Sequence, residues 1–173
     1  MKKIKYIDVG VENIGKIYHI ADVHIRNLKR HSEYREVFSQ LYGYILTTMG
    51  ENDIIYIAGD IVHAKTDMSP EVVDLTQEFF TRLADLLPTI VIPGNHDANL
   101  NNTSRLDALS PIINALSHKN LHYIKDTGGF GIGGYTFIHK SIWDTTVGFP
   151  KATGYKKNKG RIGMFHAPVD NIE

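Results

Sequence analysis

The stretch Ile54-Ile55-Tyr56-Ile57-Ala58-Gly59-Asp60 decides the fold, because a short run of β-branched and aromatic residues ends abruptly in a glycine and a carboxylate. Near-continuous apolarity over so few residues is typical of a strand buried on both faces of a parallel sheet. Runs of the same character lie on either side of it in the sequence: Lys16–Ala21, followed by Asp22 and His24, and Thr89–Ile92, followed by Asn95, His96 and Asp97. We therefore predict three central strands with polar groups at their carboxyl ends.

The segments between these strands have the periodicity of amphipathic helices. Apolar residues recur at three- and four-residue intervals from Tyr34 to Met49, and Ser32 is expected to cap that helix. Ser69-Pro70-Glu71 combines a cap, a proline suited to the first helical position and an early acid, which predicts the start of a second helix. Alternating strands and helices predict right-handed crossovers, so the carboxyl ends of the strands meet along one edge of the sheet.

The pattern changes after Asp97. We expect one more helical stretch over Arg105–Leu116, then short strands between Leu121 and His166, some of them paired as hairpins. The glycine-rich Gly128–Gly134 is one of these strand-like segments. It lacks the Lys-Ser/Thr pair of a phosphate-binding loop, so its glycines favour turns over a nucleotide-binding site. The predicted fold class is α/β, with layers built from parallel central strands and crossover helices, followed by antiparallel strands. A single domain over residues 1–173 is expected.

Composition limits the classes of function. The 173 residues include 19 basic and 19 acidic side chains, so a uniformly positive nucleic-acid-binding surface is excluded and any contact with a polyanion must be local. The absence of cysteine excludes disulfides, thiolate metal sites and cysteine nucleophiles. The N-terminus lacks an apolar leader, and no stretch approaches the roughly 18 apolar residues of a membrane span. A soluble protein of the cytoplasm or another intracellular compartment, with no membrane partner, is expected.

The polar groups at the three strand ends are of the types that bind divalent cations. Carboxylate, imidazole and amide donors suit ions that activate water against phosphate esters. Asp60 taken alone also fits an ordinary turn or helix cap. Three such clusters in order after three strands indicate a two-metal hydrolase, because ligands of open α/β sheets bind at the carboxyl ends of the strands. His19 lies within a strand and is expected to be packed or hydrogen-bonded, not a metal ligand.

The clusters also resemble a known family. In order, they match the first four signatures of the calcineurin-like metallophosphoesterases from about Lys16 to His166: Asp22-Val23-His24, Gly59-Asp60, Gly94-Asn95-His96-Asp97 and a later lone His166. Within that superfamily, Gly59–His63 followed by Ser69-Pro70-Glu71 is similar to the nuclease subunit of SbcCD-type complexes, which repair double-strand breaks in DNA.

The resemblance implies a role for each residue. The metal ligands would be Asp22 and His24 for one ion, Asp60 for both ions, and Asn95 and His166 for the other. His96 would protonate the leaving oxygen, Asp97 would orient His96, and His63 would lie near the scissile phosphate. Such mixed donors without thiolate favour two Mn²⁺ ions, with Fe or Zn²⁺ as alternatives.

A fifth family signature, Gly-His-x-His, is absent from this sequence. Each metal ion would therefore lack one imidazole. We expect the chain to be a C-terminally truncated domain that binds metal weakly and cleaves poorly on its own. Two alternatives stay open: the missing ligands come from another polypeptide, or the site is degenerate.

The resulting hypothesis is a metal-dependent exonuclease or endonuclease subunit acting in DNA repair or recombination. Its partners would be DNA, an SMC-like coiled-coil ATPase and a second copy of itself. Two basic stretches are candidates for contacts with the DNA backbone: Arg26, Lys29 and Arg30, and Lys156 and Lys157. Solvated loops are the alternative for these residues. The alternative functions are a phosphatase or small-molecule phosphodiesterase, and a non-catalytic scaffold.

Overall fold

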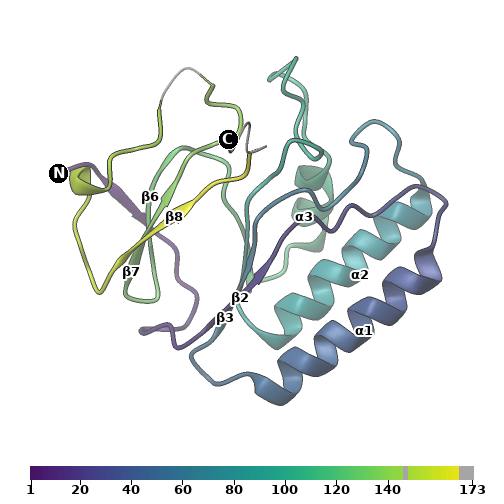
Figure 1. Ribbon diagram of the computed structural model, residues 1–173, viewed down its shortest axis with the longest axis horizontal. Coiled ribbons are helices and arrows are strands. Elements are labelled where there is room, and N and C mark those ends of the chain that lie inside the picture. The colour runs from purple at the N-terminus through teal and green to yellow at the C-terminus, as the bar shows by residue number, and fades with distance from the viewer. Residues whose placement is uncertain (146–147, 168–173) are drawn as a thin grey trace, which may run out of the picture.

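A parallel sheet forms the middle layer of the protein (Figure 1). The computed structural model describes residues 1–145 and 148–167. The four strands of this sheet lie in sequence order: β2 (Ile17–Ile20), β3 (Ile54–Ile57), β4 (Thr89–Val91) and β5 (Leu121–Tyr123). All neighbouring pairs are parallel, with Tyr18 opposite Ile55, for example. The three predicted central strands are confirmed.

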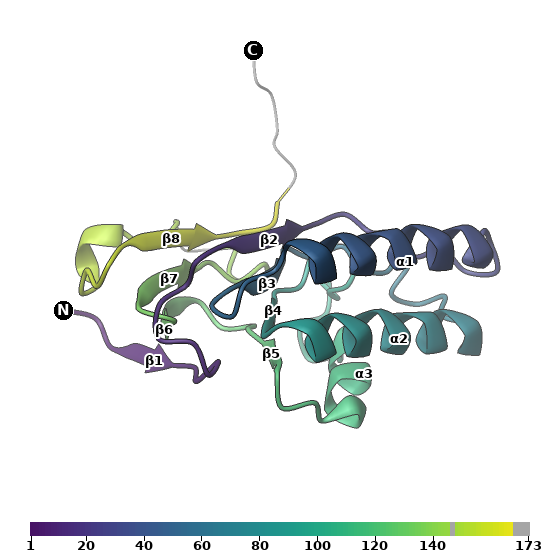
Figure 2. The ribbon, with the colours of Figure 1, turned by 90° about the horizontal axis from the view of Figure 1, so that it is seen from below.

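Three helices cover one face of this sheet, as the view from below shows (Figure 2). They are α1 (His31–Thr48), α2 (Pro70–Leu86) and α3 (Leu109–Leu116). Side chains such as Phe38, Phe79 and Leu83 pack against the helix-facing residues Ile55 and Ile57 of β3. Burial of these side chains in a continuous apolar layer is the main force that holds the helices on the sheet.

The helix boundaries confirm one predicted cap and correct another. The Ser69 hydroxyl accepts a hydrogen bond from the Val72 N–H, so the predicted start of α2 is confirmed. Helix α1 begins one residue before Ser32, and its cap residue Arg30 has a left-handed backbone and no side-chain capping bond. The predicted Ser32 cap is therefore wrong. Helix α3 begins at Leu109, later than the predicted Arg105, because residues 99–106 form turns.

A second sheet packs on the other face of the parallel sheet. Its strands lie in the order β1 (Ile4–Tyr6), β6 (Gly128–Ile132), β7 (Tyr135–His139) and β8 (Arg161–Met164). A short 3₁₀ helix, η1 (Ala152–Gly154), precedes β8. The β6–β7 pair is an antiparallel hairpin, as expected. The β1–β6 and β7–β8 pairs are parallel, so this sheet is mixed rather than wholly antiparallel. The predicted α/β class is confirmed.

A second apolar core fills the space between the two sheets. Side chains alternate along each strand, so Ile54 and Tyr56 of β3 face this core while their neighbours face the helices. Phe130, Phe137 and Met164 cover them from the second sheet. Within the described residues, no helix combines the length and apolarity that crossing a membrane requires.

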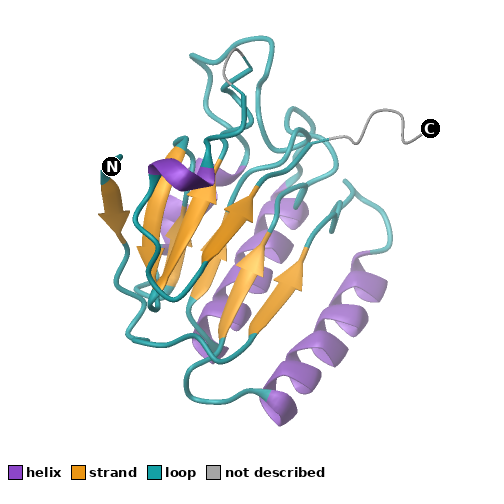
Figure 3. Cartoon of the chain, turned by 60° about the vertical axis from the view of Figure 1, so that its left-hand side comes forward, coloured by secondary structure: helices purple, strands orange, loops and turns teal. Residues whose placement is uncertain are grey.

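The stacking of the two sheets brings β2 and β8 to the same side of the molecule (Figures 2 and 3). Most strands point toward one edge, so the segments after β2, β3, β4 and β8 gather there. The ring of His166, which follows β8, contacts the carbonyl oxygen of Ala58, which follows β3. Residues separated by more than a hundred positions in sequence therefore share one edge.

Candidate metal centre

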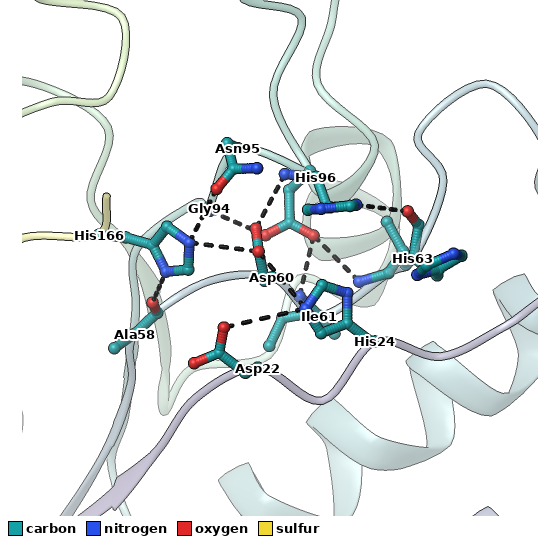
Figure 4. A network of polar contacts seen from close by, with 12 residues as sticks. Asp22, His24, Ala58, Asp60, Ile61, His63, Gly94, Asn95, His96 and His166 are labelled. Atoms are coloured by element: carbon teal, nitrogen blue, oxygen red, sulfur yellow. Dashed lines mark hydrogen bonds and ion pairs between the residues drawn. The ribbon is translucent and has the colours of Figure 1, made fainter. Parts of the chain in front are cut away.

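Five predicted metal ligands come together at this edge, as Figure 4 shows. One ligand atom each from Asp22, Asp60 and His166 lies within 4.8 Å of the others. Nε2 of His166 lies 3.2 Å from Asp60 Oδ2 and 3.1 Å from Asn95 Oδ1. On the other side of Asp60, Nε2 of His24 lies 3.6 Å from the same Oδ2 atom. The carboxylate of Asp60 therefore stands between the two groups of side chains predicted to hold two ions.

The donor set fits divalent cations. Protein ligands stand about 2.0 to 2.2 Å from ions such as Zn²⁺, so two ligands of one ion are spaced at about the separations seen here. Nε2 of His24 lies 3.8 Å from Asp22 Oδ1, which completes the group on its side of Asp60. Carboxylate, imidazole and amide donors without sulfur suit Mn²⁺, Fe and Zn²⁺. The assignment of each ligand to a particular ion stays a prediction.

Hydrogen bonds orient His166 for this role. Its Nδ1 lies 2.6 Å from the carbonyl oxygen of Ala58, so Nδ1–H donates to that oxygen and Nε2 faces Asp60 and Asn95. Metal-binding histidines are commonly fixed in this way by a second partner. The hydrogen bond with Asp60 raises the pKa of His166.

Asp60 is buried but remains ionised. Burial opposes its charge, yet the hydrogen bond from His166 and the bond from the His96 backbone N–H to Oδ1 outweigh burial, so the pKa of Asp60 lies below its ordinary value. Asp22, in contrast, is exposed to the cleft. The centre thus combines one fixed, buried carboxylate with one accessible carboxylate.

The backbone bends at the ligands themselves. Asp22, His24 and Asp60 have φ values of 56°, 51° and 54°, in the left-handed region that few residues other than glycine adopt. Hydrogen bonds hold the two bent segments together, from Asp22 N to Gly59 O and from His24 N to Asp60 O. Strained backbone of this kind is concentrated at functional sites.

Two glycines allow the segments after β3 and β4 to touch. Gly59 has a φ of 87°, and a Cβ added to it would lie 2.5 Å from the backbone nitrogen of Gly94. A Cβ added to Gly94 would overlap the backbone nitrogen and the carboxylate of Asp60. Only glycine at both positions permits this approach, which delivers Asp60 and Asn95 to the same centre.

Asp97 does not orient the His96 ring, so that expectation is wrong. Its Oδ1 accepts hydrogen bonds from the backbone N–H groups of Ile61 and Val62, and its Oδ2 accepts one from Gly94. Burial raises the pKa of Asp97 to about 7 against the opposing effect of these donors. The tight turn through Gly94 aims Asp97 into the protein, where it ties the segment after β3 to the segment after β4.

The carbonyl oxygen of His63 orients His96 instead. It lies 2.6 Å from Nδ1 of His96, which leaves Nε2 as the other ring nitrogen available to a ligand. His63, His96 and His24 form a cluster, in which the His63 and His96 rings stack with centroids 5.5 Å apart and those of His24 and His96 lie 4.7 Å apart. Burial, with the nearby Arg26 and histidines, lowers the pKa of His63. This trio could itself hold a cation.

A cleft of about 440 Å³ opens over the centre, and sequence reasoning missed part of its lining. His19 is exposed to this cleft, with its ring stacked on Tyr56, although its strand position predicts a packed side chain. β2 is an edge strand of the parallel sheet, so it has a neighbouring strand on one side only. Phe165 also lines the cleft. Its position next to the predicted ligand His166 in the sequence could have identified it as a site residue.

The two predicted basic stretches lie in different places. Arg26, Lys29 and Arg30 line a groove of about 600 Å³ between α1 and the segment after β2, next to the centre. Lys156 lies near the opposite end of the second sheet, where its carbonyl accepts a hydrogen bond from Thr136 at the start of β7. Lys157 follows it there, so only the first stretch adjoins the metal ligands.

Comparisons with known proteins give the following matches. A family model described as Calcineurin-like phosphoesterase matches residues 15–171, which include all five predicted ligands. "Uncharacterized protein R555" of Acanthamoeba polyphaga mimivirus is 43% identical over 184 residues; the match covers 99% of this chain and 14% of that protein, so the chain spans only a small part of this curated relative. Among solved structures, the Pseudomonas putida nuclease MPE matches with a TM-score of 0.43 and 18% identity over 72% of this chain and 54% of that one.

Proposed function

Since this chain belongs to the calcineurin-like phosphoesterase family of metal-dependent hydrolases, we propose that it is a phosphodiester hydrolase that acts on DNA with two divalent ions, Mn²⁺ being favoured over Fe and Zn²⁺. The observation that carries the proposal is the position of Asp60 Oδ2 between the imidazoles of His24 and His166. A single carboxylate in that place can serve two ions at once. Bound divalent ions would activate water and neutralise charge on the phosphate.

The chain's own residues supply the remaining chemistry. His96 lines the cleft, and its Nδ1–H is held by the His63 carbonyl, so a proton on Nε2 can be given to the departing oxygen. A positioned general acid contributes typically about 10² to 10⁴ in rate. His63 stacks on His96, and in this proposal it would contact the scissile phosphate.

The groove next to the centre supports DNA as the substrate. Arg26, Lys29 and Arg30 project around it directly after the first two predicted ligands. Contacts of this kind with phosphates position a strand without reading its sequence. A polymer bound at the centre has neighbouring phosphates to place against these side chains, whereas a small phosphate monoester has none.

The domain organisation and the partners are part of the same proposal. We infer that residues 1–173 belong to a single phosphoesterase domain. A DNA repair or recombination nuclease that pairs with an SMC-like coiled-coil ATPase and dimerises is the assembly we propose. Copurification of such an ATPase with the full-length protein, against its absence, tests this assembly.

The experiment for the activity compares substrates in the presence of Mn²⁺. Excess protein is incubated with linear DNA, with a simple phosphodiester and with a phosphate monoester, and isothermal calorimetry measures Mn²⁺ binding in parallel. We expect weak Mn²⁺ binding and slow cleavage of DNA in preference to the monoester. Preference for the monoester would make it a phosphatase, and Mn²⁺ binding without hydrolysis of any ester would make it a scaffold.

A further inference from the structure

Two exposed phenylalanines contact each other beside the cleft. Phe165 directly precedes His166 and lines the cleft, and 43% of its surface is exposed. Phe149 is 44% exposed, and its ring meets that of Phe165 edge to face at 87°, with centroids 6.0 Å apart. Single exposed apolar side chains are ordinary on protein surfaces, but a contiguous pair at the mouth of a reactive cleft requires an explanation.

The local structure fixes these two rings in place. Phe149 lies over Gly163 of β8, where an added Cβ would stand 3.3 Å from its ring, so the glycine leaves room for the phenylalanine. Phe165 follows β8 without a gap, between buried Met164 and His166, whose ring is tied to Ala58. Rigid aromatic surfaces bind ligands at low entropic cost because few bonds need to be immobilised.

A cation completes the pair. Nζ of Lys140 lies 5.2 Å from the centroid of the Phe165 ring, and the Lys140 backbone N–H donates to the carbonyl of Met164. Aromatic faces beside a positive charge are the combination with which proteins hold single-stranded nucleic acid, where bases stack and the ammonium group attracts the backbone. A base inside a duplex has both faces covered by its neighbours and cannot use such a surface.

We propose that Phe149, Phe165 and Lys140 form a platform on which an unpaired base next to the scissile phosphate stacks, so that single-stranded ends of nucleic acid are the preferred substrate. The inference rests on the proposed hydrolysis of phosphodiesters and specifies the substrate class. Phe165 and His166 both line the cleft, so a base stacked on Phe165 would lie beside a predicted metal ligand.

The test compares two short single strands that differ only at two central positions, where one has bases and the other has abasic linkers. Binding is measured by fluorescence anisotropy at low salt. EDTA removes divalent ions, so the strands are not hydrolysed and binding is measured without metal. Wild type should bind the strand with bases about 5- to 100-fold more tightly, the range that stacking of one base supplies. Phe165→Leu and Phe149→Leu should each reduce this ratio toward one.

Two control variants separate stacking from other effects. Tyr44→Leu removes an exposed aromatic side chain of α1 and should leave the ratio unchanged. Lys140→Gln should weaken both strands alike and reduce the salt dependence of binding. Phe149→Leu decides the matter if Phe165→Leu disturbs its neighbour His166, because Phe149 adjoins no predicted ligand in sequence.

The outcomes also separate this inference from the proposed function. A ratio near one for wild type, or a ratio that both leucine variants retain, would overturn the platform; the rings would then cover another protein segment. Calorimetry with Mn²⁺ tests the metal centre independently. Base discrimination without Mn²⁺ binding would support the platform and contradict Mn²⁺-dependent hydrolysis. Mn²⁺ binding without base discrimination would support the metal centre and contradict the platform.

Discussion

Two polar clusters beside the same parallel sheet are built around buried carboxylates, yet they are completed in different ways. Asp107, before α3, is buried and accepts hydrogen bonds from Ser110, Tyr123 and the ammonium group of Lys125. At the metal centre, the described residues within ion-pair distance of Asp22 and Asp60 are only histidines. A carboxylate with its own ammonium partner is structural, whereas carboxylates whose only ionisable partners are imidazoles are arranged for a cation from solution.

The comparison predicts the largest effect at Asp60. Asp60→Asn should lower Mn²⁺ affinity by more than about 100-fold, because changes to residues behind the ligands alone cost about 10- to 100-fold. The asparagine oxygen can still accept from the His96 N–H, so the fold should survive. Calorimetric titration with Mn²⁺ measures this effect. Asp107→Asn is the matched control, and an equal loss of affinity there would remove the distinction between the clusters.

His96 tests whether the centre does chemistry as well as bind ions. His96→Ala should reduce single-turnover cleavage by about 10²- to 10⁴-fold, the contribution of a general acid, with little change in Mn²⁺ affinity. Quenched reactions with excess protein give the rate. His118→Ala, a histidine paired with Asp85 on the surface, should have no effect. Loss of Mn²⁺ binding in His96→Ala would instead make His96 a ligand.

At Asp107 the expected effect is on stability. Asp107→Ala leaves the buried N–H groups of Leu109 and Ser110 without an acceptor and removes the partner of Lys125, which should cost about 3 kcal/mol of unfolding free energy. Urea unfolding measures it. Asp85→Ala, at an exposed carboxylate, should cost less than about 0.5 kcal/mol. A change as small as this control in Asp107→Ala would show that the network is dispensable.

The smallest expected effect is on how the free energy of unfolding changes at acidic pH. Hydrogen bonds from Ser110 and Lys125 outweigh burial and hold the pKa of Asp107 below its ordinary value of 3.8. Because the folded-state pKa is the lower one, the stabilisation is complete above pH 3.8 and is lost as the pH falls through the depressed pKa. Unfolding free energy measured from pH 6 downward should therefore fall less steeply in Asp107→Asn than in wild type below about pH 4. If the unfolding free energies of the two proteins fell in parallel with pH, the depressed pKa of Asp107 would be contradicted.

The sequence predicted those parts of the fold that depend on local patterns. Apolar runs identified β2, β3 and β4, and the polar residues after them identified the centre, because parallel strands with crossover helices leave few other arrangements. Strand β1 was missed, since its three residues are partly charged and pair with β6 more than a hundred residues away. The role of Asp97 was misjudged for a similar reason: its partners Ile61 and Val62 are 36 and 35 residues away in sequence.

The contact between Gly59 and Gly94 determines which residues around the centre can be exchanged. Since the two loops touch through main-chain atoms, the backbone sets the distance between the positions of Asp60 and Asn95. Side chains around this contact can be exchanged without altering that distance. The permanent part of the centre is thus the pair of residues that have no side chain at all.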